Sequence, residues 1–232
     1  MADFQIPQVP DVEEAFRKAH KALEGIVPRT QAEPEEGRSL SEVIRGFQLT
    51  LRAAEMVAAT QFGPLVSWKT PDFRPVDWHL VTAVVDLDHG VAEPGQVAVS
   101  RDATEGPHGG WYGSALDLAG RAYKRAAGWD FSPGEAGKWL VMLAPVEGWS
   151  GGDGDLWSFT GHLIGFVVLN DHDDDGTYEA VTHVWTAAAW RRQGIAQRLL
   201  AEAKVRFGFS VIEGPYSDDG RALLVGSGYL DA

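Results

Sequence analysis

The chain of 232 residues carries a net charge of −13, and its 44% hydrophobic content is enough for a folded core. The acidic balance argues against nucleic-acid binding, which depends on Lys and Arg to neutralise phosphates, and no apolar run reaches the length of a membrane span. The absence of cysteine excludes disulfides and thiolate chemistry, and the N-terminus lacks a secretory signal, so we expect a cytoplasmic protein.

Residues 1–75 predict a helical extension that ends in a proline-containing connector. Apolar residues recur with helical spacing over residues 11–25. The capping box Ser39-Leu40-Ser41-Glu42 opens a second predicted helix, which reaches about Thr60. Beyond it, the helical pattern is interrupted by Pro64, Pro71 and Pro75. The apolar faces of these helices could pack on the later domain or form a homodimer, in which a partner chain could also complete the sheet.

Residues 76–232 alternate strand-like and helix-like segments, which indicates one α/β domain. We expect strands at 79–87, 96–100, 139–144, 162–169, 179–186 and 209–213, and helices at 111–127, at 195–206 and after Ser217. A glycine-rich loop is expected at 147–155 and a hairpin turn at 171–176.

The segment from Trp190 to Ala196 joins a predicted strand to a predicted helix. The first N–H groups of a helix have no internal partners, and the helix dipole adds partial positive charge there, so such a turn suits a diphosphate. Gly194 would let an anion approach the backbone with no Cβ in the way, and Arg191 and Arg192 add full charges.

Arg191-x-x-Gly194-x-Ala196 resembles the Arg/Gln-x-x-Gly-x-Gly/Ala signature of the GNAT superfamily of acyl-CoA-dependent N-acyltransferases. The resemblance covers about residues 139–229, and its end at Gly228-Tyr229 looks like that of the family's last helix. It implies an α/β fold in which a mixed, mostly antiparallel sheet is flanked by helices. The acyltransferase domain would span residues 76–232, after the N-terminal helical extension.

The resemblance also implies acetyl-CoA as the acyl donor and a primary amine as the acceptor, which attacks the thioester directly in a ternary complex. Arginines 191 and 192 and the backbone amides of the turn would bind the diphosphate, the latter from Gln193, Gly194, Ile195 and Ala196. The strand residues that would pair with the pantetheine arm are Val184, Trp185 and Thr186. An alternative is a catalytically weak GNAT-fold binding or scaffold module that acts through its N-terminal helices.

Attack by the amine requires a base near the nucleophile. In GNAT enzymes a carboxylate often lies on the strand before the signature, where this sequence has Glu179. His183 is the rival candidate because the pKa of imidazole is close to neutrality. Period-two alternation predicts that Glu179, Val181, His183 and Trp185 share one face of the strand.

Many members of the family protonate the leaving thiolate with a tyrosine of the last helix. Matching Ser217 and Gly228-Tyr229 to the family's ending places Leu224 where that tyrosine would stand. Tyr216 or Tyr229 could substitute for it, water could do so, or the fold could serve binding alone.

Residues 139–190 contain eight carboxylates and no Lys or Arg. Trp149 and Trp157 could form an aromatic wall for a cationic ligand, with Asp153 and Asp155 in the loop between them. We therefore expect a cationic amine as the acceptor, although an acidic surface could also serve solubility alone.

The segment Asp171–Gly176 matches the first half of a calcium loop, D-x-D-x-D-G. The acid required at the twelfth position is replaced by Thr182, so a hairpin turn without a metal is expected.

Overall fold

The computed structural model describes residues 40–70, 80–86, 114–133, 137–150 and 157–231. In chain order, its elements are α2 (Leu40–Phe62), β1 (Leu65–Thr70), β2 (Val81–Asp86), α3 (Ala115–Ala127), β3 (Lys138–Ser150), β4 (Trp157–Asn170), β5 (Ala180–Thr186), η2 (Ala188–Trp190), α4 (Ile195–Phe207), β6 (Val211–Ile212) and α5 (Asp218–Gly226). The helix predicted at 11–25 and the strand predicted at 96–100 lie outside the described residues.

The strands form one six-stranded sheet in the order β2-β3-β4-β5-β6, with β1 paired to β4. All neighbouring strands are antiparallel except β5 and β6, which are parallel. The α/β fold with a mixed, mostly antiparallel sheet flanked by helices is therefore confirmed. Among the residues described, no helix combines the length and apolar character needed to cross a bilayer.

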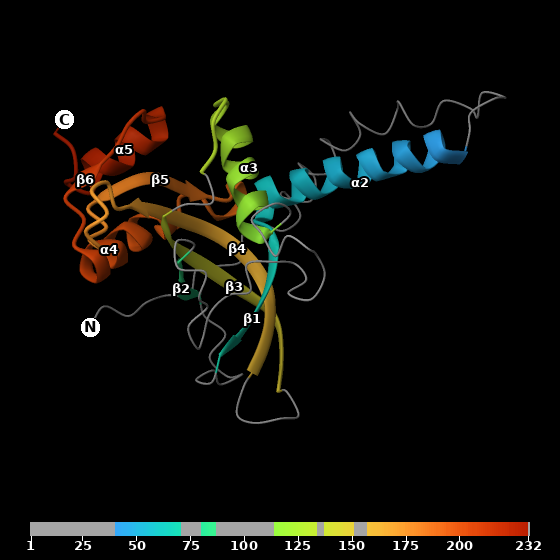
Figure 1. Cartoon of the computed structure of the whole chain (residues 1–232), viewed down its shortest axis with the longest axis horizontal. Helices are drawn as coiled ribbons and strands as arrows, with labels where there is room; N and C mark the ends of the chain where they lie inside the picture. Colours follow the sequence, from blue (N-terminus) through green and yellow to red (C-terminus); the bar gives the residue numbers. More distant parts are fainter. Residues whose placement is uncertain (1–39, 71–79, 87–113, 134–136, 151–156, 232) are drawn as a thin grey trace.

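Helices cover both faces of the sheet, α3 on one side and α4 on the other (Figure 1). Alternate side chains of β3 point to opposite faces, as the strand period requires. Trp139 and Val141 pack with α3 residues such as Leu116, whereas Leu140 packs in a second core with Leu199 of α4. The sheet is thus buried on both faces next to the two helices.

Local sequence signals fix several helix ends. The end of α3 and the cap of α5 are as expected, whereas α3 begins at Ala115, after the predicted start at residue 111. The Ser114 hydroxyl caps α3 by accepting a hydrogen bond from the N–H of Asp117, and α3 ends at Gly128, whose φ is 70°. Ser217 caps α5 in the same way by accepting from the N–H of Gly220. Short-range hydrogen bonds of this kind depend on neighbouring residues alone, so their sequence signatures are readable.

Two segments differ from the expected loops. Residues 65–70 lie in the predicted connector, but they form β1, which pairs with β4 over residues 157–162. Strand β3 extends into the predicted glycine-rich loop, because residues 147–150 continue the strand and pair with residues 157–160 of β4. Both errors have the same cause, since pairing with a distant strand is invisible to a local pattern.

Gly63 joins α2 to β1 at a point where the backbone of β4 passes very close. Its φ is +88°, and a Cβ added there would lie 2.0 Å from the carbonyl oxygen of Leu163. Gly176 has a nearly identical φ of +86°, but a Cβ there would meet nothing within 4 Å. The two positions therefore share a backbone conformation that would strain any residue with a Cβ, and they differ in the room for a side chain.

We predict that Gly63→Ala destabilises the protein by roughly 1–3 kcal/mol more than Gly176→Ala, because only the first also forces two backbone segments apart. Thermal denaturation of the two variants measures this difference. Equal losses of Tm would show that strain at positive φ, and not the close approach of α2 to β4, governs both sites.

Candidate active site

The sheet opens between β5 and β6. These strands pair only at Ala180↔Val211 and Val181↔Ile212, and the N–H of Glu213 donates to the carbonyl of Val181 at 2.8 Å. Beyond this point β5 continues to Thr186, whereas the other chain turns toward α5. A cleft of about 780 Å³ fills the opening, lined by β5, the ends of α3 and α4, and residues 212–224.

The N-terminus of α4 faces this cleft. Its N-cap is Gly194, with φ +74° and no side-chain cap, and a Cβ at this position would meet nothing within 4 Å. Ile195, Ala196 and Gln197 follow as cleft residues, and first-turn N–H groups of a helix have no intrahelical acceptor. The space above Gly194 and the donors behind it fit an anionic group such as a diphosphate.

Two arginines precede Gly194 and line the cleft. The Nε of Arg191 donates to the carbonyl of Thr186 at 3.2 Å, which ties the turn to the end of β5. The guanidinium of Arg192 pairs with the carboxylate of Asp219 in α5 at 2.9 Å, and both side chains are exposed. Gln193 does not line the cleft, because its amide donates to the carbonyl of Ala189.

The open edge of β5 carries buried donors without partners. Trp185 is 4% exposed, and its indole nitrogen has no hydrogen-bond partner among the residues that the structure describes. The hydroxyl of Thr186 is likewise buried and unpaired within the described part of the chain. Both residues line the cleft, and an unpaired buried polar group is costly, so these atoms fit a ligand that supplies acceptors.

The prediction that His183 shares a face of β5 with Glu179 and Val181 is wrong. Val181 pairs with Leu169 and His183 with Val168, so Thr182 is an extra residue in the strand. Such a bulge reverses the alternation. Val181 therefore packs on the α4 side, whereas His183 contacts Tyr123 of α3 on the other.

His183 is held among aromatic rings behind the cleft. Its Nδ1 lies 3.3 Å from the hydroxyl of Tyr123, and the two ring centroids are 5.4 Å apart. Burial lowers the pKa of His183 below its usual value, and the negative charge of Glu213 opposes this shift. The imidazole is therefore neutral at pH 7 and can accept a proton.

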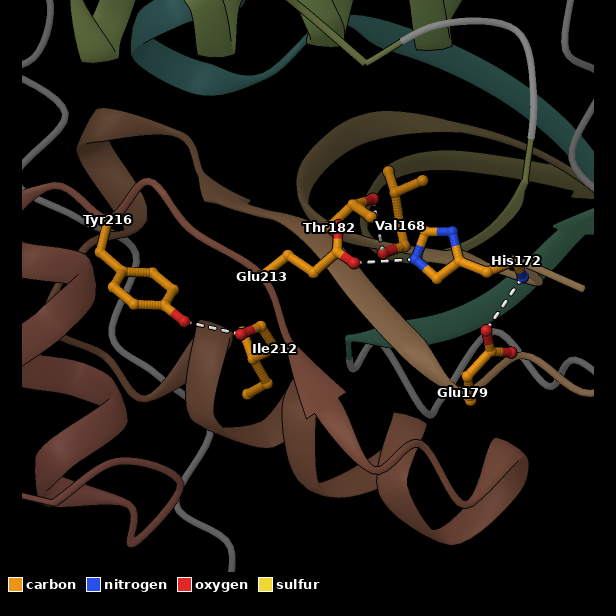
Figure 2. A network of polar contacts seen from close by, with 7 residues as sticks. All are labelled: Val168, His172, Glu179, Thr182, Ile212, Glu213 and Tyr216. Atoms are coloured by element: carbon orange, nitrogen blue, oxygen red, sulfur yellow. Dashed lines mark hydrogen bonds and ion pairs between the residues drawn. The ribbon is translucent and has the colours of Figure 1, made fainter.

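Glu179 lies outside the cleft, just before β5 begins. Its Oε1 accepts a hydrogen bond from the N–H of His172 at 2.9 Å, and the Nε2 of the same histidine contacts Oε1 of Glu213 at 2.8 Å (Figure 2). The carboxylate predicted as the base thus serves the turn before β5. Of the two glutamates in this network, only Glu213 lines the cleft.

The family comparison agrees with this geometry. Residues 124–210 match the model of the acetyltransferase (GNAT) family. The matched residues run from α3 through the signature and past the end of α4, so the resemblance to the GNAT family in the C-terminal part of the chain is confirmed. No curated protein and no solved structure matches the chain significantly.

The two tyrosines that could protonate the leaving thiolate, Tyr216 and Tyr229, have different surroundings. Leu224 is buried and lines the cleft where the family's tyrosine was expected. Tyr229 does not line it, and its ring packs 5.7 Å from that of Phe209. Tyr216 does line it, and its hydroxyl donates to the carbonyl of Ile212 at 2.6 Å (Figure 2).

Two of the residues predicted to bind the acceptor, Trp149 and Trp157, do not line the cleft. Trp149 and Trp157 belong to adjacent strands at the far end of the β3–β4 hairpin, which points away from α4 and α5 (Figure 1). This end of β4 pairs with β1, and β5 pairs only with residues 165–170. Asp153 and Asp155 lie outside the described residues.

The structure adds cleft residues that the sequence did not single out, namely Tyr123, Trp129, Glu213 and Asp219. No short motif surrounds any of them, and they come from three separate segments.

In the turn before β5, Asp171 and Asp173 approach Glu179, with one oxygen from each within 4.8 Å of the others. Asp171 accepts hydrogen bonds from the N–H groups of Asp175 and Gly176, which is the expected hairpin turn.

We predict that Gly194→Asp abolishes acetyl-CoA binding, because it adds a side chain and a negative charge where the diphosphate would lie. Gly208→Asp is the matched control, since Gly208 ends the same helix with a φ of +70° and nothing within 4 Å of an added Cβ. Calorimetry should show binding to the control alone. Equal affinity of both variants would contradict a diphosphate site at this turn.

A second prediction concerns Asp219, which holds Arg192 away from an incoming anion. Asp219→Asn should tighten acetyl-CoA binding up to about fivefold, the effect of freeing a surface pair worth roughly 0.2–1 kcal/mol. Asp218→Asn is the control, because Asp218 also lines the cleft but makes no ion pair among the described residues. Equal effects of both substitutions would mean that the pair itself does not restrain Arg192.

Proposed function

We propose that this chain is an N-acetyltransferase that moves an acetyl group from acetyl-CoA to a primary amine. The observation that carries the proposal is the cleft in which the unpaired edge of β5 meets the open N-terminus of α4. The N-terminus of α4 and the arginines before it offer charge for a diphosphate, and β5 offers buried hydrogen-bond donors. Few ligands other than an acyl-CoA combine a diphosphate with an extended chain of amides.

Acetyl-CoA would be held along the length of the cleft. The N–H groups around Gly194, with Arg191 and Arg192, would bind the diphosphate. The pantetheine arm would lie along the open edge of β5, within reach of the unpaired groups of Trp185 and Thr186. Backbone N–H groups at Val184–Thr186 that face the thioester oxygen would stabilise the negative charge that develops there.

The reaction is direct transfer in a ternary complex. The lone pair of the neutral amine attacks the thioester carbon, a C–N bond forms, and the C–S bond breaks. The amine loses a proton, and the thiolate of coenzyme A gains one. The GNAT-family match supports this reaction class.

We propose a cationic amine as the acceptor. Three carboxylates line the cleft, from Glu213, Asp218 and Asp219, and the whole chain carries a charge of −13. Carboxylates at the mouth of a cleft raise the local concentration of cations and their rate of encounter. These carboxylates lie just after β6 and in α5.

A second candidate is a catalytically weak binding or scaffold module. It is favoured by Leu224, a buried apolar residue where a proton-donating tyrosine was expected. Such a module could act through α2, the N-terminal part of which extends away from the sheet (Figure 1). Leu49 and Leu51 of this helix are 59% and 53% exposed.

The two candidates differ in whether thiol is released. Purified full-length protein is incubated with acetyl-CoA and a panel of amines, and free coenzyme A thiol is measured. Amine-dependent release supports the transferase. Calorimetric binding of acetyl-CoA without release from any amine would favour the module, and the absence of both would reject the two candidates together.

The acceptor proposal predicts a salt effect. At saturating acetyl-CoA, kcat/KM for a cationic amine should fall as ionic strength rises, because the Debye length is only about 8 Å at physiological salt. An uncharged amine of similar shape is the control and should respond little. If the best acceptor is neutral or anionic, the cleft carboxylates do not select the substrate.

A further inference from the structure

Acyl transfer leaves a proton to be moved, and the expected donor is absent. The amine must lose a proton, and the thiolate must gain one. Leu224 cannot donate, and Tyr229 packs against Phe209 outside the cleft. Among the tyrosines that the structure describes, only Tyr123 and Tyr216 line the cleft, and the hydroxyl of Tyr216 is directed to the carbonyl of Ile212.

Tyr123 is fixed in position by its neighbours. It lies in the last turns of α3 and is 5% exposed, and its ring makes edge contacts with three others. The centroid distances are 5.1 Å to Trp129, 5.4 Å to His183 and 6.0 Å to Phe166. A ring packed in this way has little rotational freedom, so its hydroxyl keeps its place beside Nδ1 of His183.

The direction of the hydrogen bond between the two side chains follows from their environment. Burial raises the pKa of Tyr123 and lowers that of His183, so the phenol is protonated and the imidazole is neutral at pH 7. The hydroxyl of Tyr123 therefore donates to Nδ1 of His183. Because Tyr123 lines the cleft and His183 does not, Tyr123 is the member of the pair that a substrate can contact.

We propose that Tyr123 and His183 act as one unit that carries the proton from the attacking amine to the departing thiolate. Tyr123 is the catalytic residue, and His183 is the positioning residue behind it. The inference rests on the proposed acyl transfer and assigns the proton path within it.

Starting from the neutral amine, the transfers balance without another reactant; a protonated acceptor first releases one proton to solvent. As the C–N bond forms, the amine proton passes to the oxygen of Tyr123 while the phenolic proton passes to Nδ1 of His183. As the C–S bond breaks, the thiolate takes the proton of Tyr123, and Tyr123 recovers one from Nδ1. The carboxylate of Glu213, whose charge acts on His183, stabilises the transient imidazolium.

Tyr123→Phe is the first test, because it removes the hydroxyl and keeps the ring contacts. It should lower kcat by roughly 10²-fold or more while the calorimetric Kd for acetyl-CoA changes less than about twofold. Tyr229→Phe, at the tyrosine that packs against Phe209 outside the cleft, is the control and should keep kcat within about threefold. An undiminished kcat in Tyr123→Phe overturns the inference, even if the transferase itself is confirmed.

The pH profile and a double variant test the role of His183. In the wild type, kcat should be lost as pH falls through the lowered pKa of His183, below about 6.5, because protonated Nδ1 cannot accept. His183→Gln should remove this limb, and adding it to Tyr123→Phe should cost little more, because the two residues act as a unit. Fully additive losses would show that they act separately.

A measurement without turnover separates the failure of the inference from that of the proposed function. Titration of the His183 ring by NMR should give a higher pKa in Tyr123→Phe than in the wild type, because a donor to Nδ1 favours the neutral ring. Glu213, whose negative charge acts on His183, is present in both proteins. An unchanged pKa overturns the pair, and a wild type without any thiol release overturns both the transferase and its proton path.

Discussion

The separation of β5 and β6 after two residue pairs is the constraint on which the rest of the site depends. A strand edge leaves backbone N–H and C=O groups that need partners. Here the edge of β5 faces a cleft. A ligand with an extended chain of amides can supply the hydrogen-bond donors and acceptors that a neighbouring strand would supply. Because α4 begins shortly after β5 ends, the same opening also receives the N-terminus of that helix and the arginines before it.

The features that the sequence predicted correctly are local ones. The end of α3 at Gly128, the cap at Ser217 and the start of α4 after Gly194 each involve residues a few positions apart. A hydrogen bond between a hydroxyl and the N–H three residues later needs no information from elsewhere in the chain. The positive φ of Gly194 belongs to the same class, since it is set by the geometry of one turn.

The features that the sequence did not predict depend on distant partners or on register. Strand β1 follows α2 directly, but it exists as a strand only because β4 pairs with it. The prediction that Glu179 and His183 share a face of β5 is wrong because the strand contains one extra residue, Thr182. The hydroxyl of Thr182 donates to the carbonyl of Val168 (Figure 2). Tyr123 and His183 are 60 positions apart, so no spacing rule relates them.

The bulge at Thr182 also divides the site across the sheet. Val181 and Val184 pack on the α4 side, whereas His183 faces α3 with Tyr123. Without the extra residue, His183 would fall on the same face as Val181, where α4 packs. The α4 side carries the exposed arginines, which suit a hydrated diphosphate, and the α3 side carries the aromatic rings packed around Tyr123. Electrostatic interactions and hydrogen bonds are stronger in a medium of low dielectric constant. A ligand that reaches through the opening would therefore place its reacting end on the α3 side, where Tyr123 and His183 act most strongly.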